Sequence, residues 1–213
     1  MSRETQAMQD DEATGPAALW LLDGEALWRR DCAACHGADR MKGVAARYPA
    51  LHKGKLVNLE QRINLCRVEQ QKAPALAYES RELLALAAYV GRQSRGLPIA
   101  AAVNEETKSF FERGKNTFLR RQGQLNLSCA QCHDDHAGRK LAGSTIPQAH
   151  PTGYPLYRLE WQGLGSLQRR LRNCLTGMRA ENYAFGAAGL LELELYLMWR
   201  ARGMKLETPA VRP

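Results

Sequence analysis

Apolar residues recur at helical spacing along much of the chain, and several of these segments follow a residue that commonly caps a helix. Asn58 precedes a segment that places Leu59 and Cys66 on one face, seven residues apart. Ser166 precedes a similar segment, in which Cys174 lies on the same stripe as the apolar residues. Because Asn and Ser side chains accept hydrogen bonds from the first free N–H groups of a helix, we expect helices to begin after both residues.

The same periodicity predicts four further helices, over residues of about 16–30, 80–93, 104–118 and 189–197. The last segment alternates Leu with Glu and would also suit a strand. Its place matches that of the 80–93 helix in the first half, so we expect a helix there. Residues 134–165 hold five Gly and three Pro, a composition that predicts loop. The pattern as a whole predicts an all-α protein.

Two parts of the chain resemble each other. Residues 59–66 (LEQRINLC) match residues 167–174 (LQRRLRNC), with a Leu seven residues and an Arg four residues before each Cys. Upstream, residues 24–28 (GEALW) correspond to residues 114–118 (GKNTF). This repetition indicates an internal duplication.

The length of 213 residues allows one large core or two small ones. The segment at residues 94–98 (SRGLP) interrupts the helical pattern between the two copies. Its composition predicts a linker. We therefore predict two tandem domains, residues 1–97 and residues 98–213.

Each half contains a pentad of the form Cys-x-x-Cys-His: Cys32-Ala-Ala-Cys35-His36 and Cys129-Ala-Gln-Cys132-His133. Two thiols at this spacing can add to the vinyl groups of one haem while the adjacent His ligates its iron. A single match could arise by chance or form half of a zinc site. Two matches in 213 residues predict two covalently attached haem c groups, with His36 and His133 as iron ligands.

The two remaining cysteines, Cys66 and Cys174, stand in the same register of the two copies. Each could be a small buried residue, since free Cys is often buried. The two could also form a disulfide with each other in an oxidising compartment. The third possibility is that each is the second axial ligand of one haem iron, and the duplicated register favours it.

Other side chains could compete for the second axial position. They are Met41 and His52 in the first half, and Met178, Met198, Met204, His136 and His150 in the second. None of these residue types repeats in register across the two halves, whereas Cys does.

Arg170 precedes Cys174 by four residues and falls on the same face of the expected helix. A guanidinium there could hold an anion beside an iron-bound sulfur, because it offers a fixed fork of donors to oxyanions. It could equally neutralise a haem propionate, and Arg62 stands in the same place before Cys66. The second site has more basic neighbours, namely Arg169, Arg172 and Arg179. If one site handles an anion, we expect it to be the second.

The formal net charge of +8 suits an anionic substrate or an acidic partner. No nucleic-acid-binding motif accompanies this charge, so we expect no nucleic-acid partner. No apolar run is long enough to span a bilayer. The first residues do not form an export signal, but haem c is attached on the oxidising side of the membrane. We therefore expect a mature, periplasmic form whose export signal has been removed, with Met1 as an added start.

Longer stretches resemble one family closely. They are residues 61–67 (QRINLCR), 93–96 (QSRG), 123–135 (GQLNLSCAQCHDD) and 158–170 (RLEWQGLGSLQRR), and the motif Cys174-x-x-Gly-x-Arg179-Ala-Glu181. The chain is similar in these stretches to SoxA, the larger cytochrome subunit of the SoxAX complex of bacterial sulfur oxidation. The resemblance runs over nearly the whole chain, and the first pentad, which some members lack, is present.

The resemblance implies two cytochrome c-like domains, with His36 and Cys66 ligating the first haem and His133 and Cys174 the second. It implies that the second haem is catalytic, that Cys174 is modified to a persulfide, and that Arg170 contacts substrate. The implied reaction is oxidative conjugation of thiosulfate to a cysteine of the SoxYZ carrier protein. The electrons would pass through the small cytochrome SoxX to a soluble cytochrome c.

Two other functions are compatible with two such haems. A thiosulfate dehydrogenase would join two thiosulfates into tetrathionate and would need no carrier thiol. An electron-transfer dihaem cytochrome would be expected to have Met or His ligation, which the paired Cys66 and Cys174 disfavour.

Overall fold

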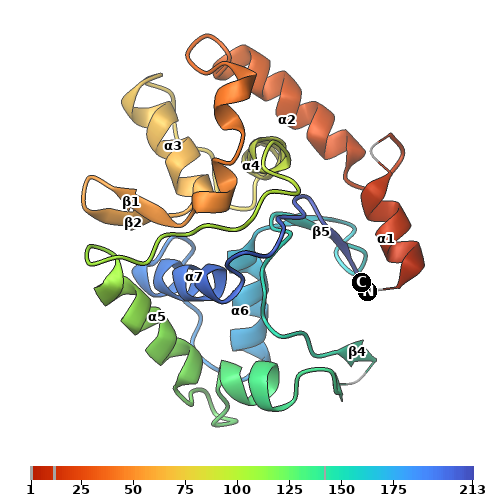
Figure 1. Cartoon of the computed structure of the whole chain (residues 1–213), viewed down its shortest axis with the longest axis vertical. Helices are drawn as coiled ribbons and strands as arrows, with labels where there is room; N and C mark the ends of the chain where they lie inside the picture. The colour runs from red at the N-terminus through yellow and green to blue at the C-terminus, as the bar shows by residue number, and fades with distance from the viewer. Residues whose placement is uncertain (1, 12, 142) are drawn as a thin grey trace.

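The computed structural model describes residues 2–11, 13–141 and 143–213, so the expectation about Met1 lies outside the described residues. Helices dominate the fold (Figure 1). They are α1 (Arg3–Asp10), α2 (Ala18–Asp31), α3 (Leu59–Glu69), α4 (Arg81–Arg92), α5 (Lys108–Leu119), α6 (Leu167–Gly177) and α7 (Ala188–Arg200). Short 3-10 turns lie at Ala38–Met41 and Ala45–Arg47, and one π-helical turn lies at Gln131–Asp135.

The helices predicted from periodicity are present, including the ambiguous segment that forms α7. Asn58 and Ser166 cap α3 and α6 as expected, each side chain accepting the N–H three residues on. The helix expected from residue 104 begins instead at Lys108. The cause is local, because Asn104 Oδ1 accepts the Thr107 N–H and Thr107 Oγ1 accepts the Asn104 N–H, which holds these residues in a turn.

The expectation of a strictly all-α protein is not confirmed, because short strands are present. They are β1 (Ala50–His52), β2 (Lys55–Val57), β3 (Lys140–Leu141), β4 (Ser144–Thr145), β5 (Leu156–Arg158), β6 (Gly163–Gly165) and β7 (Val211–Arg212). Three of the pairings are antiparallel hairpins. Thus four strands lie within residues 134–165, which we expected to be loop. Strands of two or three residues are too short to show an alternating pattern.

Two helix pairs form the body of the molecule, α2 against α4 and α5 against α7. Both pairs depend on a glycine. A Cβ on Gly24 of α2 would lie 2.2 Å from the Ala85 carbonyl oxygen of α4, and a Cβ on Gly114 of α5 would lie 2.0 Å from the Glu192 carbonyl oxygen of α7. The repeated glycines thus make the same kind of close backbone contact in both halves.

The largest apolar cluster is built mainly on α5 and α7, around Phe118 and Leu195, but it also includes Leu56 from the first half. The segment at residues 94–98 is held at both ends, although Gly96 and Pro98 are exposed. Ser94 is fully buried and its Oγ accepts the Ala45 N–H, and Leu97 accepts the Leu206 N–H. The domain division at residues 97 and 98 stays a prediction.

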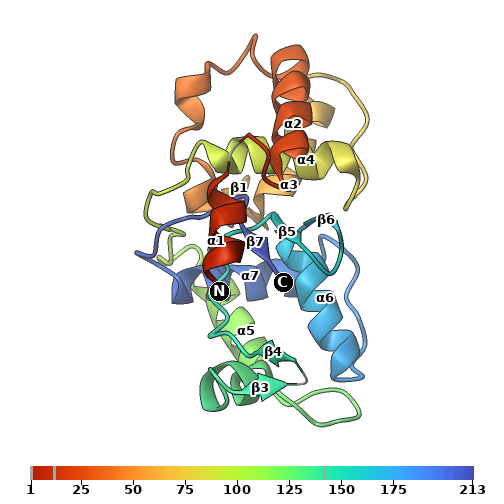
Figure 2. The same cartoon turned by 90° about the vertical axis from the view of Figure 1, so that its right-hand side faces the viewer.

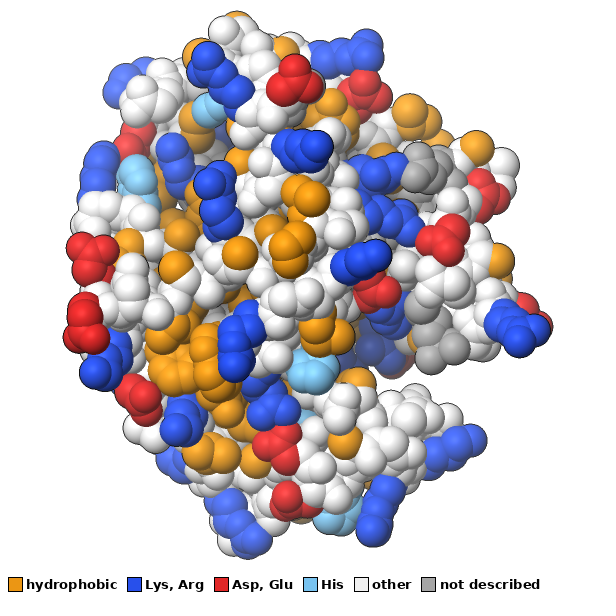
Figure 3. Space-filling model, in the orientation of Figure 1, with side chains coloured by type: hydrophobic (Ala, Val, Ile, Leu, Met, Phe, Trp, Pro, Cys, Tyr) orange, Lys and Arg blue, Asp and Glu red, His pale blue; other side chains and the backbone are white. Residues whose placement is uncertain are grey.

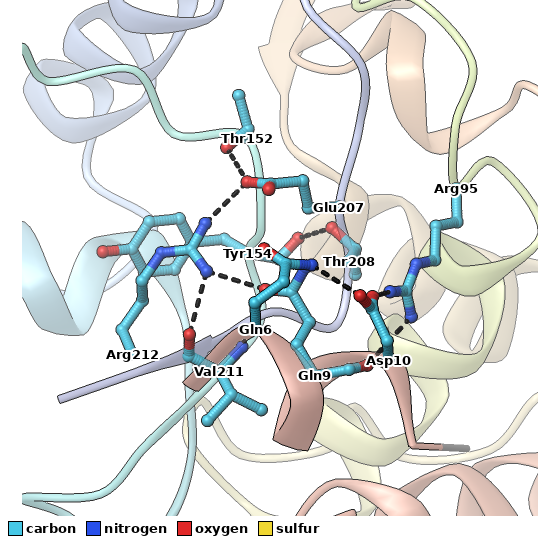
Figure 4. Close-up of polar contacts among 10 residues, drawn as sticks. All are labelled: Gln6, Gln9, Asp10, Arg95, Thr152, Tyr154, Glu207, Thr208, Val211 and Arg212. Atoms are coloured by element: carbon cyan, nitrogen blue, oxygen red, sulfur yellow. Dashed lines mark hydrogen bonds and ion pairs between the residues drawn. The ribbon is translucent and has the colours of Figure 1, made fainter. Parts of the chain in front are cut away.

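The two ends of the chain lie together (Figures 1 and 2). β7 pairs in parallel with β5, and α1 packs on β7. The buried Gln9 side chain of α1 accepts hydrogen bonds from the Val211 N–H over 3.2 Å and from Arg212 over 2.7 Å (Figure 4). α1 is also joined to the segment just after α4 through the Asp10–Arg95 ion pair at 2.6 Å.

None of the helices within the described ranges is both long enough and apolar enough to cross a bilayer.

Candidate functional site

The second pentad lies on the π-helical turn Gln131–Asp135 and the residues just before it. Two reciprocal hydrogen bonds begin this turn. The Gln131 N–H donates to Ser128 Oγ over 3.2 Å, and the Ser128 N–H donates to Gln131 Oε1 over 2.9 Å. The turn places Cys132 and His133 on a π-helical piece of backbone, with Cys129 just before it, and π-helical turns are often found at functional sites.

His133 is oriented by one strong contact. Its Nδ1–H donates to the Pro147 carbonyl over 2.7 Å, which leaves Nε2 with a free lone pair. Burial lowers the pKa of His133, and the positive charges of Arg170 and Arg200 act in the same direction. The ring is therefore neutral at pH 7, the form in which His ligates a metal.

Cys174 on α6 lies close to the second pentad. Burial raises the pKa of its thiol, Arg170 and Arg158 oppose this effect, and the neighbouring Cys132 adds to it. Burial likewise raises the pKa of Cys129 to about 12, and the proximity of Cys174 adds to that shift. The structure thus brings together Cys129, Cys132 and Cys174. We call these three residues and His133 the second cysteine site.

Arg170 also belongs to this site. Among the residues that the structure describes, its guanidinium has no ion pair and no side-chain hydrogen bond. Its neighbours on α6 are occupied elsewhere, since Arg169 lies 4.3 Å above the Trp161 ring and Arg172 lies 4.5 Å above the Phe185 ring. Arg170 is therefore the arginine of α6 that is best placed to bind an anion.

Two further arginines reach the second cysteine site, and the sequence analysis missed both. Arg158 on β5 acts on Cys174, is 15% exposed and pairs with Glu160 at 3.1 Å. Arg200 at the end of α7 acts on His133 and pairs with Asp134 at 2.5 Å. Neither stands near a pentad in the sequence, and although Arg158 begins one of the stretches that carry the family resemblance, nothing local marks it as part of the site.

The loop before β5 also contributes to the site, and the C-terminal segment holds it in place. Thr208 Oγ1 donates to the Tyr154 carbonyl over 2.8 Å, and Glu207 accepts hydrogen bonds from Thr152 and Arg212 over 2.5 and 2.6 Å (Figure 4). Burial raises the pKa of the Tyr154 phenol to about 12, while the nearby Arg170 lowers it. Tyr154 was not singled out from the sequence either.

The surface of the molecule is hollowed near the C-terminal segment. The space-filling view shows a notch between the α1–β7 end and the β3–β4 hairpin, with blue Lys or Arg side chains at its back (Figure 3). In the view at right angles, α1 lies above the β3–β4 hairpin and α6 lies to the right of both (Figure 2). A basic notch of this kind suits the entry of an anion.

The first pentad follows the C-terminal end of α2, where Cys32 is the capping residue. The Arg67–Asp31 ion pair at 3.0 Å joins the end of α3 to the end of α2. This contact brings Cys66 near Cys32, and burial together with the proximity of Cys66 raises the pKa of Cys32. We call Cys32, Cys35, His36 and Cys66 the first cysteine site.

The alternatives for the extra cysteines can be compared with the structure. All six cysteines are among the described residues and each is a free thiol, so no Cys66–Cys174 disulfide is formed. Cys66 lies with the first pentad and Cys174 with the second.

The side chains that could compete with Cys66 and Cys174 for the second axial position have different surroundings. Met178 and Met198 are buried in apolar clusters, whereas Met204 is exposed. His52 lies 3.9 Å from Glu69 and lines a hollow of about 710 Å³ between the β1–β2 hairpin, α3 and α7. That hollow includes no cysteine.

The donor sets fit haem c. Each cysteine site offers a pair of thiols at the right spacing, an adjacent His and a third Cys, and in the second site the free Nε2 of His133 is available to iron. Together with the helical fold, these sites define a c-type cytochrome.

Comparisons with known proteins specify the family. The family described as SoxA/TsdA, cytochrome c domain, matches residues 23–99 and 113–206. The chain is 34% identical to the L-cysteine S-thiosulfotransferase subunit SoxA of Pseudaminobacter salicylatoxidans, and 33% identical to the subunit of that name from Rhodovulum sulfidophilum. Each match covers 98% of this chain and 77% of the relative. The crystal structure of SoxXA from P. pantotrophus holds a similar chain, with a TM-score of 0.95 and 30% identity over 100% of this chain and 84% of that one. The chain belongs to the SoxA family.

Proposed function

We propose that this chain is the SoxA subunit of an L-cysteine S-thiosulfotransferase and that it carries two covalently attached haem c groups, one in residues 1–97 and one in residues 98–213. Cys32 and Cys35 would hold the first haem, with His36 and Cys66 as iron ligands. The second haem would be bound by the second cysteine site, with His133 and Cys174 as ligands.

The observation that carries the proposal is that Arg170 acts on both Cys174 and His133, and that the described residues offer this arginine no ion pair and no side-chain hydrogen bond. A buried sulfur next to a free guanidinium can receive an oxyanion of sulfur. The guanidinium would bind the sulfonate end, and the outer sulfur would then lie against Cys174.

The reaction can be written with balanced atoms and electrons. Thiosulfate and the carrier thiol give the carrier S-thiosulfonate, one proton and two electrons. The haem, when bound, would supply the acceptor for electrons. In one order of events, the outer sulfur of thiosulfate joins the sulfur of Cys174, or of a persulfide on it, as two electrons leave. The carrier thiolate then attacks this adduct, takes the thiosulfonate group and releases the Cys174 sulfur.

The residues around Cys174 have distinct tasks in this scheme. Arg170 binds and orients the substrate, and Arg158 stabilises negative charge on the Cys174 sulfur when it is the leaving group. Pro147 keeps the His133 ring in one tautomer and orientation through the Nδ1–H hydrogen bond.

The partners follow from the same proposal. A SoxX-like monohaem cytochrome would complete a heterodimer, a SoxYZ-like carrier would supply the thiol, and a soluble cytochrome c would accept the electrons. The periplasm is the compartment in which these partners and haem c attachment would occur together. The relatives named as SoxA and the similarity to a SoxXA chain support this assembly.

The test is thiosulfate-dependent reduction of cytochrome c by the haem-loaded heterodimer, with and without carrier protein. We expect reduction only when the carrier thiol is present, and its loss in Cys174→Ala. Cys66→Ala is the matched control, because it removes the equivalent cysteine of the first site. Reduction without carrier, yielding tetrathionate, would instead establish a thiosulfate dehydrogenase. No thiosulfate-dependent reduction under either condition would leave an electron-transfer cytochrome.

A further inference from the structure

Two arginines from different elements lie over the same aromatic ring. The Cζ atom of Arg169 on α6 is 4.3 Å from the centroid of the Trp161 ring, and the Cζ atom of Arg158 on β5 is 5.4 Å from it. Both distances lie within the range of an attractive contact between a cation and a π face. Trp161 stands in the turn between β5 and β6, so it joins this hairpin to the helix that carries Cys174.

The local backbone holds the Trp161 ring in this position. The Trp161 N–H donates to the Arg158 carbonyl over 3.0 Å, which closes the turn directly after β5. The indole lies against Gly165 at the end of β6, where an added Cβ would be 2.3 Å from the ring and 3.1 Å from Arg169 Cδ. β6 leads directly into α6, which Ser166 caps (Figure 2). The glycine therefore leaves room for both the ring and the Arg169 side chain at the beginning of this helix.

The two guanidiniums also have carboxylate partners. Arg158 pairs with Glu160 at 3.1 Å, and Arg169 Nη1 lies 4.0 Å from Glu79. These carboxylates offset the repulsion between two like charges that share one ring. Arg158 is the more enclosed of the two, with 15% of its side chain exposed against 39% for Arg169. Arg158 is thus held by the ring, by a carboxylate and by burial.

This arrangement gives the arginines around the second cysteine site different surroundings. Arg158 lies close enough to Cys174 to oppose the rise in the pKa of its thiol, so a held cation stays near the sulfur. Arg169 is occupied by the Trp161 ring. Arg170, the next residue of α6, has no ion pair among the described residues.

We propose that Trp161 is a positioning residue of the second cysteine site, because it fixes Arg158 beside the sulfur of Cys174. The same ring keeps Arg169 out of the anion-binding position. Without the aromatic face, the Arg158 side chain is free to swing with Glu160 toward solvent. A neighbouring positive charge favours the reduced state of a haem iron, so its removal lowers the reduction potential. The parts of Cys174 and Arg158 in the reaction rest on the proposed function, whereas the seating of both arginines on Trp161 does not.

The first measurement is a redox titration of the second haem in the haem-loaded heterodimer. Trp161→Leu keeps an apolar side chain but removes the π face, and we expect it to lower the reduction potential of this haem. Trp161→Phe restores the face and should stay near the wild type, whereas a merely structural role would make the two variants alike. Trp20→Leu is the matched control, because Arg81 lies 4.5 Å from the Trp20 ring centroid in the first half. It should leave the potential unchanged.

The second measurement separates kcat from KM in the carrier-dependent assay. Because Arg170 binds the anion in the proposed function, Trp161→Leu should lower kcat about tenfold and change KM less than about twofold. Arg158→Gln should lower kcat by a similar factor. Adding Trp161→Leu to Arg158→Gln should then cause little further loss, because the ring acts through this arginine.

Gly165→Ala gives an independent check, because its Cβ would displace the ring without removing it. It should act like Trp161→Leu. The proposal is refuted if Trp161→Leu keeps the wild-type potential, if Trp161→Phe does not restore it, or if Trp161→Leu and Arg158→Gln lower kcat independently. A wild type without carrier-dependent turnover, whose potential still falls in Trp161→Leu, would refute the proposed function and leave the positioning of Arg158 by Trp161 standing.

Discussion

Gly114 offers the sharpest test of how the second half is built. An added Cβ would lie 2.0 Å from the Glu192 carbonyl oxygen and 2.5 Å from its carbon. Ordinary contacts between non-bonded carbon atoms are at about 3.5 Å or more, so the 2.5 Å between the added Cβ and the Glu192 carbonyl carbon means that α5 and α7 would have to separate by about 1 Å. The obstacle is backbone, which cannot rotate away as a side chain would.

This separation would loosen the aromatic cluster between the two helices. Phe111 and Trp199 have ring centroids 4.9 Å apart, and Phe118 and Tyr196 have centroids 5.2 Å apart. Overpacking of a well-packed core costs about 1–3 kcal/mol, and we expect Gly114→Ala to fall at or above the upper end. For a chain of this size that corresponds to a fall in Tm of about 6–12 °C.

The assay is thermal unfolding followed by far-UV circular dichroism, with Gly177→Ala as the matched control. Gly177 also lies in a helix, but nothing lies within 4 Å of its added Cβ. Alanine there should be neutral or stabilise by about 0.5–1 kcal/mol, because it restricts the unfolded chain. If the Tm of Gly114→Ala lies within 1 °C of the wild-type Tm, α5 and α7 do not make this close backbone contact.

Three further outcomes follow from the site. Ser128→Ala removes one of the two reciprocal bonds of the pentad turn, so chemical denaturation should show a loss of about 1 kcal/mol in the free energy of unfolding. Arg170→Ala should raise KM for thiosulfate about 10–100-fold at unchanged haem content, whereas Arg169→Ala should change it little; equal effects would contradict the assignment. Burial raises the pKa of Glu60 to about 7 and the pKa of Glu194 to about 8. A Glu in the unfolded chain has a pKa of about 4.3, so between these values the two carboxyls are protonated in the folded chain and ionised in the unfolded chain. The free energy of unfolding should therefore fall as the pH rises from about 5 to 8, which denaturation at several pH values would check.

Local signals in the sequence were sufficient for most of the helices. Asn58, Ser80 and Ser166 cap α3, α4 and α6 because capping depends on a side chain and the three residues that follow it. The same locality explains the late start of α5, where Asn104 and Thr107 bond to each other. Helix propensity alone could not show whether residues 104–107 form the first turn of the helix or the separate turn held by the bonds between Asn104 and Thr107.

The long-range parts could not be predicted in this way. β5 pairs with β7 across more than fifty residues, and two or three residues carry no periodicity. Arg158 and Arg200 reach Cys174 and His133 only because β5 and α7 meet the pentad in space. Arg170 was identified because it lies one helical turn from Cys174. The ligand roles of the eight Cys and His residues stay predictions.

The pairing of α1 with β7 has a consequence for how the chain can be divided. Gln9 accepts hydrogen bonds from Val211 and Arg212, so α1 packs against the last strand, β7. A cut between residues 97 and 98 would leave α1 in one fragment and the surface it covers in the other. The two halves should therefore not survive as separate polypeptides, whereas a circularly permuted chain, with the old ends joined by a short linker, should keep the native fold.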